Sequence, residues 1–370
     1  MRFEGFSQCA GVYARVDVTP AGLLGDIHSP GTTNVDFNPP MLAALAQLPA
    51  DRLLAVQLGS ESFAITPAGA APVVERKVAL PARWLKGLTQ VQQFLARSHH
   101  MLDLQGPALL MLRQALPRRE SLLPLHLHTR AGRPTLGPLA NAGSVAVGGA
   151  HRLQLLAPLL PLAQSLQVWA HEDGQSSTWL LHLDGGVRFE LTLSGDAARG
   201  FSGEGAALET LLQAVPEAWL DAFDRYGWAN QRLDSVNAAL DLALPAAQLQ
   251  LLGERLAALG LLGWDLAGSH WYYRQLPYRP ERLGRLHPRW RSAQRLIDEG
   301  RVQLDAASDG RIVARVHSGD RTHTVVLDAQ ARCTCEWHSQ HQGARGPCKH
   351  ILAVRQLAQV PLHDWQHDPD

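Results

Sequence analysis

The chain has 370 residues, 46% hydrophobic and 18% charged, so it is long enough for two or three folded domains and too apolar to be disordered. Its 34 basic and 34 acidic residues cancel, which argues against a protein coated with charge for nucleic acid or for an anionic membrane. Residues 1–18 lack an apolar signal segment, and the most apolar stretch, residues 155–163, is too short to span a membrane. We therefore expect a cytoplasmic, multidomain α+β protein.

Residues 1–203 predict a mixed α/β domain, to which the sequence assigns no role. Apolar residues at helical spacing predict helices over residues 38–48, 81–98 and 107–116. Runs of apolar and β-branched residues predict strands at 53–58, 62–66, 125–129, 165–171, 178–183 and 187–194. We expect His99 and His100 to end the second of these helices, where cations favour the helix dipole.

Residues 204–280 predict a second domain, in which helices are followed by a β-hairpin. Helices are expected over 204–215, 216–226, 233–244 and 245–259, and Gly260 is placed to end the last of them. Strands at 262–266 and 271–276 then flank an Ala-Gly turn. This order resembles a winged-helix domain. A plain helical linker that carries a hairpin fits the pattern equally well.

Residues 281–370 predict a third domain, which begins with an arginine-rich helix over residues 288–299 and continues in strands at 301–305, 311–317 and 322–327. From His270 to Ala358 there are 15 basic and 8 acidic residues, a net charge of +7. The basic side chains that we expect to contact a partner are Arg282, Arg285, Arg289, Arg291 and Arg295. The plainer interpretation of these arginines is a solvated helix surface.

Three of the four cysteines lie close together near the end of the chain, as Cys333-Thr334-Cys335 and Cys348-Lys349-His350. Three thiolates and an imidazole are ligands that zinc prefers. A disulfide between Cys333 and Cys335 would close too tight a ring, and a catalytic Cys–His pair would leave two cysteines unexplained. The spacing therefore predicts one structural Zn²⁺ held by Cys333, Cys335, Cys348 and His350. His338 and His341 are weaker candidates for the fourth ligand.

This Cys-x-Cys followed by Cys-x-His resembles the SWIM zinc finger, a ββα-like module whose core would cover residues 300–357. Its three thiolates and one Zn²⁺ leave a formal charge of −1, which Arg332, Lys349 and Arg345 are placed to offset. Part of the positive charge in this region thus has a structural explanation.

No arrangement of residues predicts catalysis, so we expect the chain not to be an enzyme. SWIM-like fingers are associated with both protein and DNA binding, and two functions follow: a protein-interaction adaptor, or a DNA-binding factor that uses the basic C-terminal region. The layout also resembles bacterial SWIM proteins encoded beside a MoxR-type AAA+ ATPase and a von Willebrand A protein, which implies these as partners. The abundance of arginine over lysine, typical of GC-rich genomes, agrees with a bacterial source.

Overall fold

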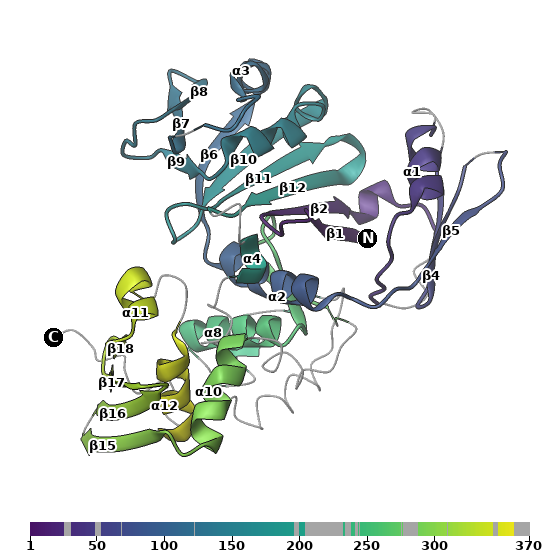
Figure 1. Ribbon diagram of the computed structural model, residues 1–370. Helices are drawn as coiled ribbons and strands as arrows, with labels where there is room; N and C mark the ends of the chain where they lie inside the picture. Colours follow the sequence, from purple (N-terminus) through teal and green to yellow (C-terminus); the bar gives the residue numbers. More distant parts are fainter. Residues whose placement is uncertain are drawn as a thin grey trace.

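The computed structural model describes residues 1–25, 31–48, 53–67, 69–121, 123–195, 200–203, 232–233, 238–240, 243, 245–274, 276, 288–308, 310–342 and 347–358. In these ranges helices lie beside several antiparallel sheets, which confirms the predicted α+β class (Figure 1). Within the same ranges, no helix is long and apolar enough to cross a membrane.

The largest sheet has six antiparallel strands in the order β1-β2-β12-β11-β10-β6. Its strands are β1 (Arg2–Phe6), β2 (Val12–Val18), β12 (Val187–Leu193), β11 (Ser177–Leu183), β10 (Ala163–Ala170) and β6 (His99–Gln105). One pairing within this sheet joins distant parts of the sequence, because Val12 of β2 lies opposite Leu193 of β12. The hairpin of β1 and β2 is therefore held in the sheet by strands far along the chain.

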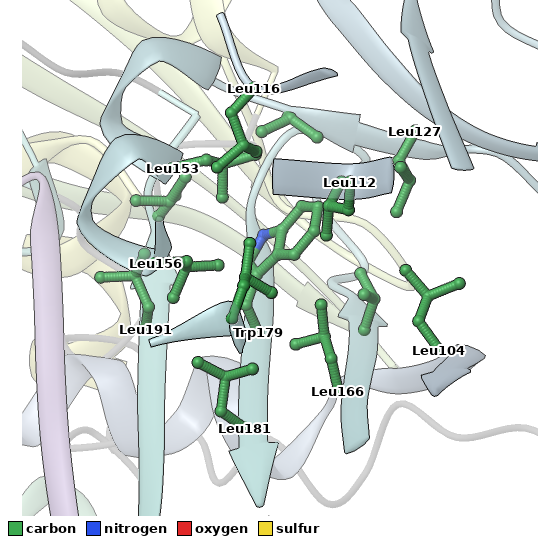
Figure 2. Packing of buried hydrophobic residues seen from close by; sticks show 14 of the residues in the cluster. Leu104, Leu112, Leu116, Leu127, Leu153, Leu156, Leu166, Trp179, Leu181 and Leu191 are labelled. Carbon is green, nitrogen blue, oxygen red and sulfur yellow. The ribbon is translucent and has the colours of Figure 1, made fainter. Parts of the chain in front are cut away.

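One face of this sheet forms the main hydrophobic core around Trp179 of β11 (Figure 2). The indole is fully buried, and its Nε1 donates a hydrogen bond to Ser177 Oγ at 3.0 Å. The core is covered by α3 (Pro107–Ala115), η2 (Ala150–Leu156) and η3 (Leu160–Leu162), and by a small sheet of β8 (Arg133–Gly137), β7 (Leu125–Arg130) and β9 (Val145–Val147). Side chains from these elements, among them Leu112 and Leu153, surround the ring.

The opposite side of the molecule is built on α2 (Ala82–Ala96), which shares a core with β2, with the short helix α4 (Gly200–Gly203) and with Leu266. Next to it lie α8 (Ala246–Ala258) and the hairpin of β13 (Leu262–Asp265) and β14 (His270–Tyr273). Gly260 follows α8 with φ of 71°, so the predicted helix end is confirmed. This part of the predicted second domain thus packs directly on the N-terminal half.

Buried ion pairs connect these two parts of the chain. Arg274, which follows β14, pairs with Glu4 of β1, with 2.8 Å between Nη1 and Oε2. Arg15 of β2 is fully buried and contacts both Glu190 Oε2 at 2.9 Å and Asp17 Oδ2 at 3.2 Å, while its Nη1 donates to the carbonyl of Trp264. Removing one partner of such a buried pair strongly destabilises a protein. These contacts therefore fix the position of the β13–β14 hairpin on the six-stranded sheet.

A second small unit consists of α1 (Pro39–Ala46) and the three-stranded sheet β3 (Ala55–Leu58), β4 (Ser62–Thr66) and β5 (Val73–Arg76). Its own core contains Met41, Phe63 and Ile65, and Phe3 of β1 packs its ring edge-on against Phe63 with 5.7 Å between centroids. This contact attaches the unit to the edge of the six-stranded sheet.

The prediction that His99 and His100 end a helix is wrong. The helix α2 stops at Ala96, and His99 begins β6, where it pairs with Ala170. The His100 ring packs edge-on against Trp169, with 5.1 Å between centroids. Cross-strand packing therefore decides the conformation here, rather than the helix dipole.

Several expectations fall on residues outside the described ranges. These are the helices at 204–215 and 216–226, most of the helix at 233–244, and the side chains of Arg282 and Arg285. The winged-helix interpretation depends on those helices and stays a prediction, as do the domain boundaries at 203 and 280.

The C-terminal unit is a four-stranded antiparallel sheet covered on one face by two helices (Figure 1). It contains α10 (Pro288–Asp298), β15 (Val302–Ser308), β16 (Arg311–Ser318), β17 (Arg321–Leu327), β18 (Arg332–Cys333), α11 (Glu336–His341) and α12 (Lys349–Ala358). Leu296 of α10 and Ile351 of α12 share one core with Val316 and Val325 of the sheet. The arginine-rich helix is therefore an integral part of this unit.

Candidate metal centre

The backbone brings the two halves of the cysteine motif together at the end of the sheet. Cys333 lies in β18 opposite Val325, and one further hydrogen bond, from Thr334 N to Thr324 O, extends the strand to Cys335. Cys335 then begins α11, since its carbonyl accepts the amide of Ser339 at 3.0 Å. The two thiols leave one extended segment on the same side, as period-two alternation requires.

The second half of the motif lies at the start of α12. Cys348 directly precedes the helix, and its Sγ accepts the amide of Ile351 at 3.4 Å, in the manner of an N-cap side chain. The first turn of a helix also favours negative charge, which suits a thiolate at this position. His350 follows two residues later in the same turn, so the helix fixes both side chains relative to each other.

The four ligand atoms lie within 4.8 Å of one another, and all four residues are buried, with at most 7% of their surface exposed. His350 Nδ1 is 3.7 Å from Cys333 Sγ and 3.9 Å from Cys348 Sγ. Bonds of about 2.3 Å to sulfur and about 2.0 Å to nitrogen at tetrahedral angles separate those atoms by about 3.6 Å. The spacing therefore fits one zinc ion, with Nδ1 as the coordinating nitrogen of His350.

The thiols lie close enough together to raise one another's pKa values. Hydrogen bonding to Cys348 and burial raise the pKa of Cys335 to about 12, and Cys333 has the largest part in raising the pKa of Cys348 to about 11. Neutral thiols would thus persist at this position at physiological pH, whereas a dication reverses the balance and holds them as thiolates. The predicted cofactor is confirmed as one buried Cys3His site fit for a single structural zinc ion.

A second histidine supports the ligand imidazole. His323 of β17 packs its ring against His350 with 4.3 Å between centroids and 34° between the planes. The Nε2 atom of His350 is buried and has no hydrogen-bond partner among the described residues. Ring packing by His323 is therefore a contact that restrains the orientation of the imidazole. The sequence gives no sign of it, because His323 lies 27 positions before His350.

Of the two alternative ligands, the described one, His338, does not enter the site. The cluster of metal-binding side chains excludes His338, whose carbonyl accepts the amide of Gln342 at the end of α11. The side chain of His341 lies outside the described part of the chain. Three cations were expected to offset the charge of the site. Arg332 instead forms an exposed ion pair with Asp328, and Arg345 lies outside the described residues. Burial lowers the pKa of His350, and the charge of Lys349 lowers it further.

The arginines of α10 differ in their surroundings. Arg289 points into the unit, donates from Nη1 to the carbonyl of Pro347 at 3.0 Å, and lies 4.6 Å from the ring centroid of Trp337. It therefore buttresses the backbone directly before Cys348. Arg291 and Arg295 are exposed on the outer face of the helix. Whether the five predicted arginines contact a partner stays a prediction.

The helix α11 was not expected from the sequence, which predicts a loop between the two halves of the motif. Its six residues, Glu-Trp-His-Ser-Gln-His, are too few and too polar to produce a helical pattern. The signal that does exist in the sequence is local, because Glu336 supplies an acidic residue to the first turn. Trp337, which packs against the core from this helix, secures its position.

Comparison with known protein families identifies a segment of this unit. A family model described as the SWIM zinc finger matches residues 323–356, which include all four predicted ligands. No curated protein matches the chain. The matched segment begins at His323, whose ring packs against that of His350, and it ends two residues before the end of α12. Residues 323–356 are therefore a SWIM zinc finger with a buried Cys3His site.

Proposed function

We propose that the chain is a non-enzymatic adaptor, which binds a partner protein through the surface of its zinc-stabilised finger. The observation that carries this proposal is the closed metal site, where four protein ligands converge and all are buried. Structural zinc sites of this kind have no open position for water or substrate. The zinc would thus stabilise the core of α10, α12 and the sheet, and the function would lie on the surface of that unit.

The charge distribution of the finger favours a protein partner over DNA. Arg301 pairs with Glu299 at 2.6 Å, Arg315 with Asp305 at 2.8 Å, and Arg332 with Asp328. Non-specific DNA binding depends on cations that are available to phosphates. These three pairs involve three of the 15 basic residues and three of the 8 acidic residues that give the net charge of +7, so the surface is of mixed sign.

The helix that would read a DNA groove in a winged-helix protein also argues against DNA. Along α8, Leu252, Glu254 and Leu256 are buried, and α8 packs on α2. Glu254, at 3% exposure, pairs with Arg97, whose Nε lies 3.0 Å from Oε1. A helix that is buried and carries an inward carboxylate is poorly suited to enter a major groove.

For the partner, the resemblance to bacterial SWIM proteins implies a MoxR-type AAA+ ATPase or a von Willebrand A protein. A cytoplasmic location belongs to the same proposal, because three ligand thiols stay reduced there. The test is isothermal titration of the zinc-loaded chain with each purified candidate from the same genome. Cys335→Ser, which lacks a complete finger, is the control. We expect saturable binding that is lost in this variant.

A DNA-binding function makes a different prediction in a second titration, with mixed-sequence duplex DNA between 50 and 200 mM salt. A protein that contacts six or more phosphates loses about three orders of magnitude in affinity over such a range. We expect weak binding with a shallow salt dependence. A steep dependence, together with no binding to either candidate protein, would replace the adaptor by the DNA-binding alternative.

A further inference from the structure

The outer face of α10 contains a shallow hollow of about 440 Å³, lined by Trp290, Arg291, Gln294, Arg295 and Asp298. The indole of Trp290 is half-buried because its inner side packs against the finger core, and the rest of the ring is accessible from the hollow. Arg291 and Arg295 are one helical turn apart on the exposed side, where neighbouring side chains lie about 6 Å from each other. The hollow therefore combines an aromatic surface with two adjacent guanidinium groups.

These two arginines differ from the eight described arginines that pair with a carboxylate within 4 Å. Those eight are Arg2, Arg15, Arg97, Arg188, Arg274, Arg301, Arg315 and Arg332. No described carboxylate pairs with Arg291 or Arg295. The nearest acid in the hollow, Asp298, accepts a hydrogen bond from Gln294 Nε2 at 2.9 Å instead. Both guanidinium groups thus keep their full capacity for bidentate pairing.

A third cation, Lys86, is near enough for the charge of Arg291 to act on it, although it does not line the hollow. Lys86 of α2 is half-buried, and its pKa is lowered by burial and by the charge of Arg291. Two like charges from separate elements therefore lie near each other, although one of them has lost part of its hydration. This arrangement is unfavourable in the free protein and becomes favourable when an anionic group lies between the two side chains.

We propose that Arg291, Arg295 and Trp290 form a docking site for an acidic segment of a partner protein, and that the nearby charge of Lys86 adds to the attraction. Carboxylates of that segment pair with the two guanidinium groups, and an apolar side chain next to them packs on the indole. This inference rests on the proposed adaptor function and specifies the chemistry of its partner.

The site favours a carboxylate-bearing peptide over nucleic acid because its positive charge is confined to one end. Asp298 closes the other end of the hollow and repels a continuous row of phosphates. A peptide can place carboxylates against the arginines and an uncharged or basic residue beside Asp298. The separation of the arginines matches carboxylates at positions i and i+4 of a helix or i and i+2 of an extended segment.

The test uses the full-length, zinc-loaded chain and a fluorescein-labelled peptide of 12 residues that contains four glutamates and two leucines. A second peptide has glutamine in place of glutamate, and a third probe is labelled 12-base-pair DNA. The variants are Arg291→Gln with Arg295→Gln, Lys86→Gln, and Asp298→Asn. Arg311→Gln with Arg321→Gln is the matched control, because it removes two exposed arginines at turns of the sheet. Fluorescence anisotropy gives each Kd.

We expect the acidic peptide to bind the wild type, and the double change on α10 to weaken it at least tenfold. Lys86→Gln should weaken it about threefold, Asp298→Asn should strengthen it, and the control pair should remain within about twofold. The inference is overturned by no binding to the wild type at 1 mM peptide, by equal losses in the two double variants, or by equal binding of the glutamine peptide. Tighter binding of DNA that depends on Arg291 and Arg295 also overturns it.

This outcome is distinguishable from failure of the proposed function. If the acidic peptide binds as expected while neither the AAA+ ATPase nor the von Willebrand A protein does, the site stands and those partners are wrong. If either protein binds equally well to the wild type and to the double variant on α10, the adaptor function stands and the site is wrong.

Discussion

The guanidinium of Arg289 lies over the indole of Trp337, 4.6 Å from the ring centroid, and donates to the carbonyl of Pro347. One side chain of α10 thus connects the helix that follows Cys335 with the residue that precedes Cys348. The same arginine was predicted to face a partner. Its contacts tie together the two segments that hold the metal site.

Replacing Arg289 by alanine should therefore destabilise the finger. The variant loses a cation–π contact and a charged hydrogen bond, which together contribute about 2 kcal/mol. Hydrogen exchange of the amides of α12 measures this as faster local opening. Arg295→Ala is the control on the same helix, and its exposed side chain predicts little change. Equal protection in both variants would show that Arg289 has no structural role.

Removing one ligand should remove the metal. We expect one zinc ion per chain in the wild type and the loss of most of it in Cys335→Ser, because a site with three ligands no longer completes its tetrahedron. Elemental analysis after dialysis gives the metal content. Cys9→Ser is the control: this cysteine is exposed and separate from the cluster, so its variant should keep a full equivalent. A full equivalent in Cys335→Ser would exclude Cys335 as a ligand.

Chelation should loosen the finger and leave the N-terminal sheet intact. Cys333, Cys335 and Cys348 belong to the same buried core as Ile351 and Val325, so zinc binding and packing of this small unit are coupled. The six-stranded sheet has a separate core around Trp179. Limited proteolysis should reveal new cleavage after residue 288 when a chelator is added. Unchanged cleavage there would mean that the finger folds without metal.

The stability of the N-terminal half should depend on the protonation of Glu190. Burial raises the pKa of Glu190 to about 7 from 4.5, more than Arg15 lowers it. Between these values the folded protein binds a proton that the unfolded chain has released, so this group's contribution to stability decreases as pH rises from 4.5 to 7. Over the whole interval this contribution changes by about 3 kcal/mol.

Urea unfolding at pH 5 and pH 7.5 tests this expectation by comparing the wild type with Glu190→Gln. The wild type should lose stability relative to the variant over this interval, because glutamine cannot titrate. Glu61→Gln is the control, since the Glu61 side chain is 77% exposed. Other titrating groups, such as buried His171, contribute equally to both proteins and cancel in the difference. A constant difference across the interval would contradict the raised pKa.

The parts of the fold that the sequence predicts are those whose pattern is local. The apolar stripe of α2 and the glycine that ends α8 belong to single elements, and the metal ligands follow a fixed spacing. The strands β1 and β2 were not identified individually, because Arg15 and Glu4 occupy positions that a half-buried strand normally gives to apolar residues. Their partners, Glu190 and Arg274, lie 175 and 270 residues away, so no window of sequence contains both.

The same limit applies to the surroundings of the metal site. The ligand set could be predicted because cysteine and histidine at this spacing have few other interpretations. The roles of His323 and Arg289 could not, because each acts through a ring or a carbonyl that a different element supplies. An arginine that stacks on a tryptophan and one that faces solvent are indistinguishable in the sequence of α10.

The pairing of β2 with β12 has a consequence for how the chain folds during synthesis. The edge of β2 that faces away from β1 has no partner strand until β12, with Leu193 opposite Val12, has left the ribosome. At about 5 to 20 residues per second, the first hairpin waits roughly 10 to 40 s with an open edge. Glu4 waits longer still for Arg274. The nascent chain therefore exposes an unpaired strand edge for about half of its synthesis and an uncompensated charge for longer, which is the interval in which a chaperone would protect it.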